Sequence, residues 1–292
     1  MYILFAPRTY RTLNTLVCQY IEYISLSITD HPITNLEQEQ MQQSKSAAIL
    51  VGHGSIHSDS GKSMIRIAAR LREQAIMPIV EAGFLNYNQP TLADAVHKSK
   101  ARGATTVIVQ PYFLIDGHYA SKALPQLVRD VAETEPMLRF TIAETLGYHP
   151  ALLKLAEQRI CAVSAQPSVE TALLFVAHGT PMEPANAPIV RAADVVGRRL
   201  GFGDSLVGYL DCNDPTIPAA IDQLVDAGYR RLVILPYFLH IGRHVRTDLP
   251  NHFAAARERH PNIEIIVAHH LDYDPLLVNV AGERILASSL CS

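Results

Sequence analysis

Residues 47–55 read AAILVGHGS, and residues 172–180 read ALLFVAHGT. In both stretches an apolar run of strand length ends in a His-Gly pair, and His178 lies 125 positions after His53. The same shift aligns further identical motifs, namely PYFL at residues 111–114 with PYFL at 236–239, and Pro90-Thr91 with Pro215-Thr216. Because one register holds along both halves, we interpret the chain as a tandem duplication.

Each half alternates short apolar runs with longer segments of helical period, which is typical of βαβ units around a parallel sheet. The runs are continuously apolar, so we expect helices on both faces of each sheet. The predicted strands lie at residues 47–51, 78–84, 105–110 and 139–143, and then at 172–176, 206–210, 231–235 and 264–267. We therefore predict an α/β fold of two tandem flavodoxin-like parallel-sheet modules facing a central cleft.

The duplication divides the chain into three predicted segments. Residues 1–46 are expected to be an extension that ends in a polar linker, because residues 37–46 lack the apolar side chains of a core. Residues 47–168 form the first repeat and residues 169–292 the second.

The composition excludes several classes of partner. The 292 residues include 25 Lys and Arg against 28 Asp and Glu, so no polybasic field predicts binding to nucleic acid or a membrane surface. No run of about 18 apolar residues predicts a membrane helix, and the first 45 residues show no secretory cleavage pattern. Four dispersed cysteines disfavour a zinc ribbon, an iron–sulfur cluster or a disulfide framework. We expect a cytoplasmic protein with a small-molecule partner.

Three polar residues of the second half follow three successive predicted strands. Ligands of parallel sheets bind beyond the carboxyl ends of the strands, where we expect His178, Asp211 and His244. Imidazole suits iron, cobalt, nickel and zinc, and a carboxylate adds charge and can accept a proton. Each residue alone has a plainer reading, as a hydrogen-bonded loop histidine, a turn cap or a solvated surface residue. Together they predict a divalent-metal site in which all three are ligands and catalytic residues.

The first half serves as an internal control for this site. A shift of 125 places His53, Asn86 and Tyr119 at the corresponding positions, and His118 comes one residue earlier. Asn86 cannot act as an anionic base. We infer that the second half carries the reaction while the first half chiefly walls the cleft, with His53 and His118 as second choices for catalysis. A reversed arrangement, or one in which both halves are active, stays open.

At this point the motifs resemble a known family. The second half reads AHGT at 177–180, YLD at 209–211, PYFLHIGRH at 236–244 and DLP at 248–250. Over about residues 47–288 the chain resembles the sirohydrochlorin cobaltochelatases and ferrochelatases, which are ATP-independent enzymes with a chelatase-like α/β fold. Members often have Glu where this chain has Asp211, and in two-domain members the first half is often catalytic. The first half here departs further from the motifs, since it lacks the acid before Leu124-Pro125.

The resemblance implies insertion of a divalent metal into sirohydrochlorin on a route to siroheme or a cobalamin-type cofactor. His178 and His244 would hold the ion and receive pyrrole protons, and Asp211 would stabilise the imidazolium or take a proton. Because the substrate carries peripheral carboxylates, we predict contacts from Arg243 and Arg246, beside His244, and from Arg191, on the helix after His178. These substrate-binding arginines also have a plain reading as solvated surface residues, most of all Arg191.

The identity of the metal stays open between Fe²⁺, Co²⁺ and Ni²⁺, because the affinity of any nitrogen-rich site rises from iron through cobalt to nickel, so the ligand type alone does not choose. No Gly-x-x-x-x-Gly-Lys-[Ser/Thr] or Gly-x-Gly-x-x-Gly motif predicts a nucleotide, and we expect no iron–sulfur cluster. A monomer that uses its two repeats as a pseudo-dimer is the expected assembly.

Two other functions compete with the chelatase reading. A carrier that binds a metal or a tetrapyrrole without turnover fits the same residues. A histidine-phosphatase-like hydrolase also places His-Gly after its first strand, but its phosphate-binding Arg precedes that His. Gly52 and Ala177 stand at that position here, so the bidentate donor is missing and phosphoryl transfer is disfavoured.

Overall fold

The computed structural model describes residues 45–55 and 61–290, which lie in one compact unit spanning residues 44–292. The predicted extension falls outside the described residues, apart from Lys45 and Ser46, which begin the first strand. Among the described helices, none has the length and apolar character needed to cross a membrane.

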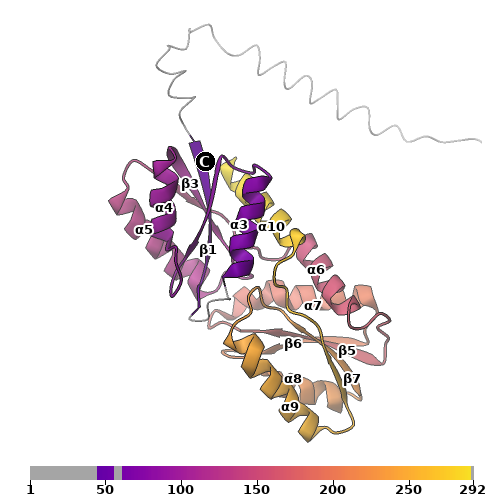
Figure 1. The fold of residues 1–292 in the computed structure, drawn as a ribbon. Helices are drawn as coiled ribbons and strands as arrows, with labels where there is room; N and C mark the ends of the chain where they lie inside the picture. Colours follow the sequence, from indigo (N-terminus) through magenta and orange to yellow (C-terminus); the bar gives the residue numbers. More distant parts are fainter. Residues whose placement is uncertain (1–44, 56–60, 291–292) are drawn as a thin grey trace, which may run out of the picture. The chain divides into compact units, whose positions relative to one another are not determined.

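The described part of the chain contains two four-stranded parallel sheets, with strand orders β2-β1-β3-β4 and β6-β5-β7-β8 (Figure 1). Every predicted strand is present, so the predicted α/β class with two flavodoxin-like modules is confirmed. The strands of the first sheet are β1 (Lys45–Gly52), β2 (Ile79–Phe84), β3 (Ala104–Pro111) and β4 (Arg139–Ile142). Those of the second are β5 (Thr171–Ala177), β6 (Asp204–Tyr209), β7 (Arg231–Pro236) and β8 (Glu264–Val267).

Both sheets pair their strands in the same register. Leu50 of β1 lies between Ala82 and Gln110, and 125 positions later Phe175 of β5 lies between Val207 and Leu235. The central strand of each sheet therefore ends beside the same two neighbours. The His-Gly pair is delivered to the same place in each repeat.

Helices cover both faces of each sheet, as the continuous apolar runs predicted. The first repeat contains α3 (Lys62–Glu73), α4 (Leu92–Ala101), α5 (Leu124–Thr134) and α6 (Pro150–Cys161). The second contains α7 (Ala187–Leu200), α8 (Ile217–Asp226), α9 (Leu249–Arg259) and α10 (Pro275–Ser289). On one face of each sheet lies a core of its own, built by α4 and α5 on β1 and β3 and by α8 and α9 on β5 and β7.

The other faces share a single hydrophobic core, because the last helix of each repeat crosses to the opposite sheet. Helix α10 packs on β3 and α3 of the first repeat, while α6 packs on β7 and α7 of the second. Figure 1 shows the yellow helix α10 running beside the indigo helix α3, from which it is far removed in sequence. The repeats are thus interlocked by an exchange of helices.

Polar contacts fix these exchanged helices at their surfaces. Arg284 of α10 donates to Glu144 at 2.6 Å, and Arg199 of α7 donates to Glu157 of α6 at 3.1 Å. At Gly282 of α10, an added Cβ would lie 3.4 Å from Leu71, so the small residue permits close approach to α3. Each sheet therefore depends on a helix from the other repeat. The boundary near residue 168 remains a proposal about the sequence repeat.

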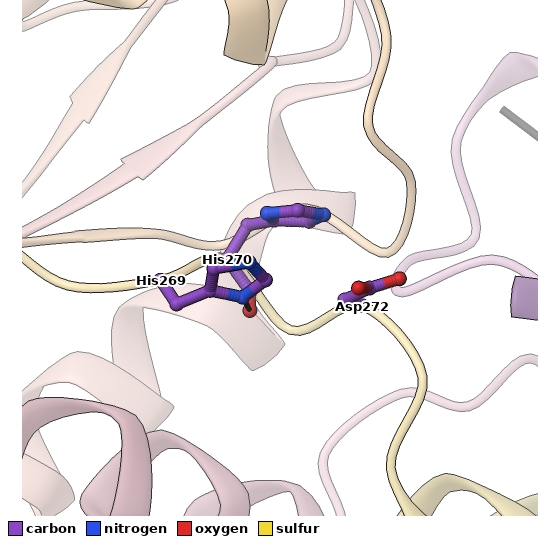
Figure 2. Close-up of side chains that lie close together, drawn as sticks. All are labelled: His269, His270 and Asp272. Atoms are coloured by element: carbon purple, nitrogen blue, oxygen red, sulfur yellow. Dashed lines mark hydrogen bonds between the residues drawn. The ribbon is translucent and has the colours of Figure 1, made fainter. Parts of the chain in front are cut away.

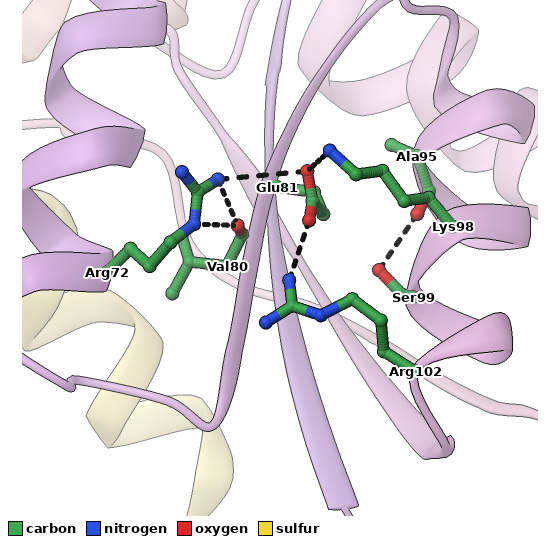
Figure 3. Close-up of polar contacts among 7 residues, drawn as sticks. All are labelled: Arg72, Val80, Glu81, Ala95, Lys98, Ser99 and Arg102. Carbon is green, nitrogen blue, oxygen red and sulfur yellow. Dashed lines mark hydrogen bonds and ion pairs between the residues drawn. The ribbon is translucent and has the colours of Figure 1, made fainter.

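One carboxylate is buried in the first sheet and neutralised by cations from two helices. Glu81 of β2 is 5% exposed and accepts from Lys98 at 2.9 Å and from Arg102 at 2.8 Å. Arg72 lies 3.7 Å from the same carboxylate and donates to the carbonyl of Val80 (Figure 3). A buried carboxylate needs such partners, because desolvation penalises the unpaired charge. The cluster ties α3 and α4 to the edge strand between them.

Candidate metal-handling site

The His-Gly turn after each central strand is held by the neighbouring strand loop. In the second repeat, the backbone N–H of Asp211 donates to the carbonyl of His178 at 2.9 Å. Gly179 has φ +88°, and a Cβ there would lie 1.9 Å from the carbonyl oxygen of Asp211. Only glycine fits this left-handed position against another backbone. The turn therefore fixes His178 beside the loop that carries Asp211.

The same turn sets the tautomer of His178. Its Nδ1 lies 3.2 Å from the carbonyl oxygen of Gly179, and in the first repeat Nδ1 of His53 lies 2.7 Å from that of Gly54. A carbonyl oxygen can only accept, so Nδ1 carries the proton in both rings. Nε2 of each neutral imidazole is then left with its lone pair, in the form that ligates metals.

His244 is oriented by a carboxylate that the sequence analysis did not include in the site. His244 and Asp248 are the first and last residues of the π-helical turn η3 (His244–Asp248), and His244 Nδ1 lies 2.7 Å from Asp248 Oδ2. A carboxylate on Nδ1 leaves Nε2 for a ligand and makes the ring more basic. The spacing of four residues within the HxxxD motif was the signal available in the sequence. Turns of this π type recur at functional sites.

The structure brings the two predicted histidines together. The ring centroids of His178 and His244 are 5.0 Å apart, with the ring planes at 80°. His178 is exposed and His244 is half-buried, so both rings are accessible. Because metal–nitrogen bonds are about 2.0–2.1 Å long, a separation of this order allows two imidazoles to bind one ion.

Asp211 is not gathered with these imidazoles. Its carboxylate accepts from the backbone N–H of Cys212 at 2.8 Å, and the residue is exposed at the loop surface. Burial, and then the charge of Asp211, raises the pKa of the Cys212 thiol. Among residues 45–55 and 61–290, His178, Asp211 and His244 do not form a group whose ligand atoms all lie within 4.8 Å of one another. The share of Asp211 in the site remains a proposal.

In the first repeat the corresponding loops place a phenol against the histidine. Tyr119, at the position of His244, contacts His53 with ring centroids 4.2 Å apart, and Tyr87 lies 6.0 Å from the same ring. His118 contacts Tyr119 at 5.9 Å. The first repeat thus presents one imidazole with two tyrosines, where the second presents a pair of imidazoles.

The strand-end loops of the two repeats touch one another. Ser63 Oγ lies 3.3 Å from His240 Nδ1, and Ser121 Oγ lies 3.3 Å from the sulfur of Met182. A Cβ added at Gly117 would lie 3.2 Å from Oγ1 of Thr180. The start of α3, which follows β1, therefore contacts the loop after β7, and the segment after β3 contacts the loop after β5. The strand-end segments of the two repeats are thus in direct contact.

The predicted substrate arginines have different surroundings. Arg243 is exposed, and its Nε lies 3.6 Å from Oδ1 of Asp248, the same carboxylate that orients His244. Arg246 is exposed on η3. The guanidinium of Arg191 lies 4.1 Å from the ring centroid of Tyr148, so it stacks on the loop before α6. Two of the three arginines therefore flank the imidazole pair on its own turn.

Comparisons with known proteins match both repeats. The family model described as CbiX matches residues 47–163 and again residues 172–288. A sirohydrochlorin cobaltochelatase of Priestia megaterium is 22% identical over 241 residues, covering 82% of this chain and 78% of that protein. A sirohydrochlorin ferrochelatase of the same organism is 20% identical over 242 residues, covering 82% of this chain and 89% of the relative. The solved structure of SirB from Bacillus subtilis with Fe³⁺ shares the fold, with a TM-score of 0.74 and 19% identity over 84% of this chain and 95% of that one.

Proposed function

Because this chain belongs to the CbiX family through both of its repeats, we propose that it is a lyase that inserts a divalent metal ion into sirohydrochlorin. Relatives that match more than four fifths of the chain are named sirohydrochlorin cobaltochelatase and sirohydrochlorin ferrochelatase. The metal is a substrate of this reaction, and the product is metallated sirohydrochlorin, which is siroheme or a precursor on the route to a cobalamin-type tetrapyrrole.

One observation carries the proposal to particular residues. His178 and His244 come from two strand ends of the second repeat, and each has its Nδ1 engaged. Their rings meet at 5.0 Å with Nε2 of each left as the ligand atom. A single histidine at a strand end can have many structural roles. Two histidines whose rings meet, each with Nδ1 engaged and Nε2 left as the ligand atom, favour a metal ion between them.

The reaction exchanges one divalent ion for two protons. Two pyrrole N–H bonds break, the metal forms bonds to the four ring nitrogens, two of them in place of the N–H bonds, and both protons leave the macrocycle. His178 and His244 release the ion as the macrocycle nitrogens replace them, and their freed Nε2 atoms then accept protons. Asp248 stabilises the imidazolium of His244 through the 2.7 Å contact. Asp211 lies one loop away, where its carboxylate stabilises an imidazolium or takes one of the two protons in place of a histidine.

The macrocycle binds between the two sets of loops in this proposal. Tyr87 and Tyr119 are 70% and 44% exposed beside His53, so the first repeat offers aromatic surface to a flat ring. Arg243 and Arg246 offer cations to the peripheral carboxylates from the opposite side. The first repeat therefore acts as the wall, and the second supplies the ligands and bases.

The wider setting follows from the chemistry. Metal binding by the macrocycle drives the reaction, so the proposal needs neither nucleotide nor iron–sulfur cluster. The described cysteines Cys161 and Cys212 are free thiols, which fits a reducing cytoplasm. Since each chain holds both loop sets, a monomer suffices. Imidazole and carboxylate are ligands for each of Fe²⁺, Co²⁺ and Ni²⁺, so the ligand types do not choose the physiological metal.

The test is an anaerobic assay of the purified protein with sirohydrochlorin and each of Fe²⁺, Co²⁺ and Ni²⁺. We expect the absorbance of the free macrocycle to convert to that of the metal complex faster than without protein. Asp211→Ala should slow this conversion while macrocycle uptake persists. Uptake without any acceleration, by the wild-type protein and with all three metals, would instead identify a carrier.

A further inference from the structure

A second group of metal-competent side chains follows β8. One ligand atom each from His269, His270 and Asp272 lies within 4.8 Å of the other two. Figure 2 shows the two imidazoles close together with the carboxylate of Asp272 beside them. The imidazole centroids are 4.4 Å apart, and the planes are inclined by 27°. Among the described residues, this is the group of three or more His, Cys, Asp or Glu side chains whose ligand atoms lie close enough to hold one ion.

The buried member of the group has an unused nitrogen. His270 is 4% exposed, and its Nε2 has no hydrogen-bond partner within the described residues. A buried polar atom without a partner costs free energy, so such an atom in a native structure calls for an occupant. The phenol oxygen of Tyr112 is also buried and has no hydrogen-bond partner within the described residues. Burial raises the pKa of this phenol, and the negative charge of Asp272 raises it further.

The backbone that carries these ligands is anchored from the other repeat. Arg159 of α6 donates to the carbonyl of Leu271 at 2.8 Å and to that of His270 at 3.2 Å. The same guanidinium lies 3.3 Å from Asp274, which caps α10. The ligand atoms are therefore held on a fixed loop between the exchanged helices. A preorganised loop loses little freedom when an ion binds.

The repeat gives an internal control for this group as well. A shift of 125 positions maps His269, His270 and Asp272 onto Glu144, Thr145 and Gly147. Glu144 pairs with Arg284 of α10, and Thr145 is buried. The fold therefore does not require two histidines and an acid at this loop, since the first repeat forms the same loop without them. The cluster is specific to the second repeat.

The group formed by His269, His270 and Asp272 can be reached from solvent by a route that does not pass His178 and His244. His269 is exposed, and both histidines line a pocket of about 400 Å³ that reaches Ile241 and Val245 on the loop and turn around His244. The remaining walls are mostly apolar side chains of α9 and β8. An ion can thus reach His269 from solvent without passing through the space between His178 and His244.

We propose that His269, His270 and Asp272 form a second site for a first-row divalent cation, separate from the site of insertion. Two imidazoles and one carboxylate match the donors that Fe²⁺, Co²⁺, Ni²⁺ and Zn²⁺ accept, and they leave positions for water. Buried His270 contributes the lone pair that lacks a partner, and the exposed His269 is the point of entry. The site holds an ion whether or not a macrocycle is bound.

The test counts Co²⁺ ions on metal-free protein in the absence of sirohydrochlorin, by anaerobic titration followed by calorimetry and by the visible spectrum of the bound ion. We expect the double variant His178→Ala, His244→Ala to retain one bound Co²⁺. Adding His269→Ala should weaken that remaining site by tenfold or more. Asp272→Asn in the same background should also weaken it, and it checks the result with a nearly isosteric change.

Glu144→Ala, at the equivalent loop of the first repeat, is the matched control and should leave Co²⁺ binding unchanged. The inference is wrong if the double variant binds no Co²⁺, or if His269→Ala and Asp272→Asn both leave its affinity as it was. Insertion activity is measured separately on wild-type protein. An inactive wild-type protein that still binds an ion through His269 would count against the proposed function alone.

Discussion

Asp248→Asn tests whether the carboxylate behind His244 prepares that imidazole for metal. The substitution keeps the size of the side chain and removes its charge, so the fold of η3 should persist. His244 would then lose the anion at 2.7 Å that holds Nδ1–H in place and raises the basicity of Nε2. We expect weaker metal binding and slower insertion.

The size of the effect follows from the exposure of the pair. Residues that support a metal ligand in this way change affinity or activity by about 10–100-fold. The side chains of His244 and Asp248 are 44% and 23% exposed, so water screens part of their interaction. We therefore expect the lower end of the range, about tenfold in the rate of Co²⁺ insertion, or about 1.4 kcal/mol.

The assay is anaerobic Co²⁺ insertion into sirohydrochlorin at limiting metal, with wild-type protein in parallel. The chain offers a matched control in Asp222, which lies 2.7 Å from Nε2 of His260 on helices away from the strand ends. Asp222→Asn removes a His–Asp contact of equal length and should leave the rate unchanged. Equal rates for Asp248→Asn and wild-type, or equal losses in both variants, would refute the reasoning.

Three further predictions concern the loops and the packing. Burial and the charge of Asp211 raise the pKa of the Cys212 thiol, so Asp211→Asn should lower that pKa and speed the alkylation of Cys212 near pH 8. The alkylation rate is read by peptide mass spectrometry, and an unchanged rate would count against the contact between Asp211 and Cys212. Glu81→Ala should lower the free energy of unfolding, measured in urea titrations, by about 1–2 kcal/mol. The loss is limited because the paired side chains Lys98 and Arg102 are partly exposed and regain water. An unchanged free energy of unfolding would mean that the cluster around Glu81 is not stabilising. Gly282→Leu should destabilise by about 1–3 kcal/mol through overpacking against Leu71, while Gly282→Ala should be neutral or stabilising; equal thermal midpoints for both variants would contradict the docking of α10 on α3.

The central strands were predictable because β1, β3, β5 and β7 each contain a short apolar run that ends in Gly, Pro or a polar loop. The pairing of the strands follows the same repeat, since the same register recurs in both sheets. The exchange of α6 and α10 was not predictable in this way. The apolar faces of these helices predict that they cover a sheet, but the local sequence pattern does not indicate which of the two similar sheets they cover.

The site was predictable to the level of strand ends. Because parallel strands end at one edge of a sheet, the sequence predicted that His178 and His244 lie close together, and their rings are in contact. It could not orient a side chain within its loop, and Asp211 turns its carboxylate to the backbone of Cys212. The HxxxD spacing pointed to Asp248, but its contact with His244 depends on the π-helical turn η3, which the motif alone does not predict. Three-dimensional packing decides each of these.

The most direct measurement compares anaerobic Co²⁺ insertion by His178→Ala with insertion by His53→Ala, the equivalent substitution in the first repeat. If the imidazole pair of the second repeat carries the reaction, His178→Ala should lose about 100-fold or more in rate, beyond the range of a supporting residue. His53→Ala should keep most of the rate, with weaker binding of the macrocycle. An active His178→Ala protein together with an inactive His53→Ala protein would contradict the account and place the chemistry in the first repeat.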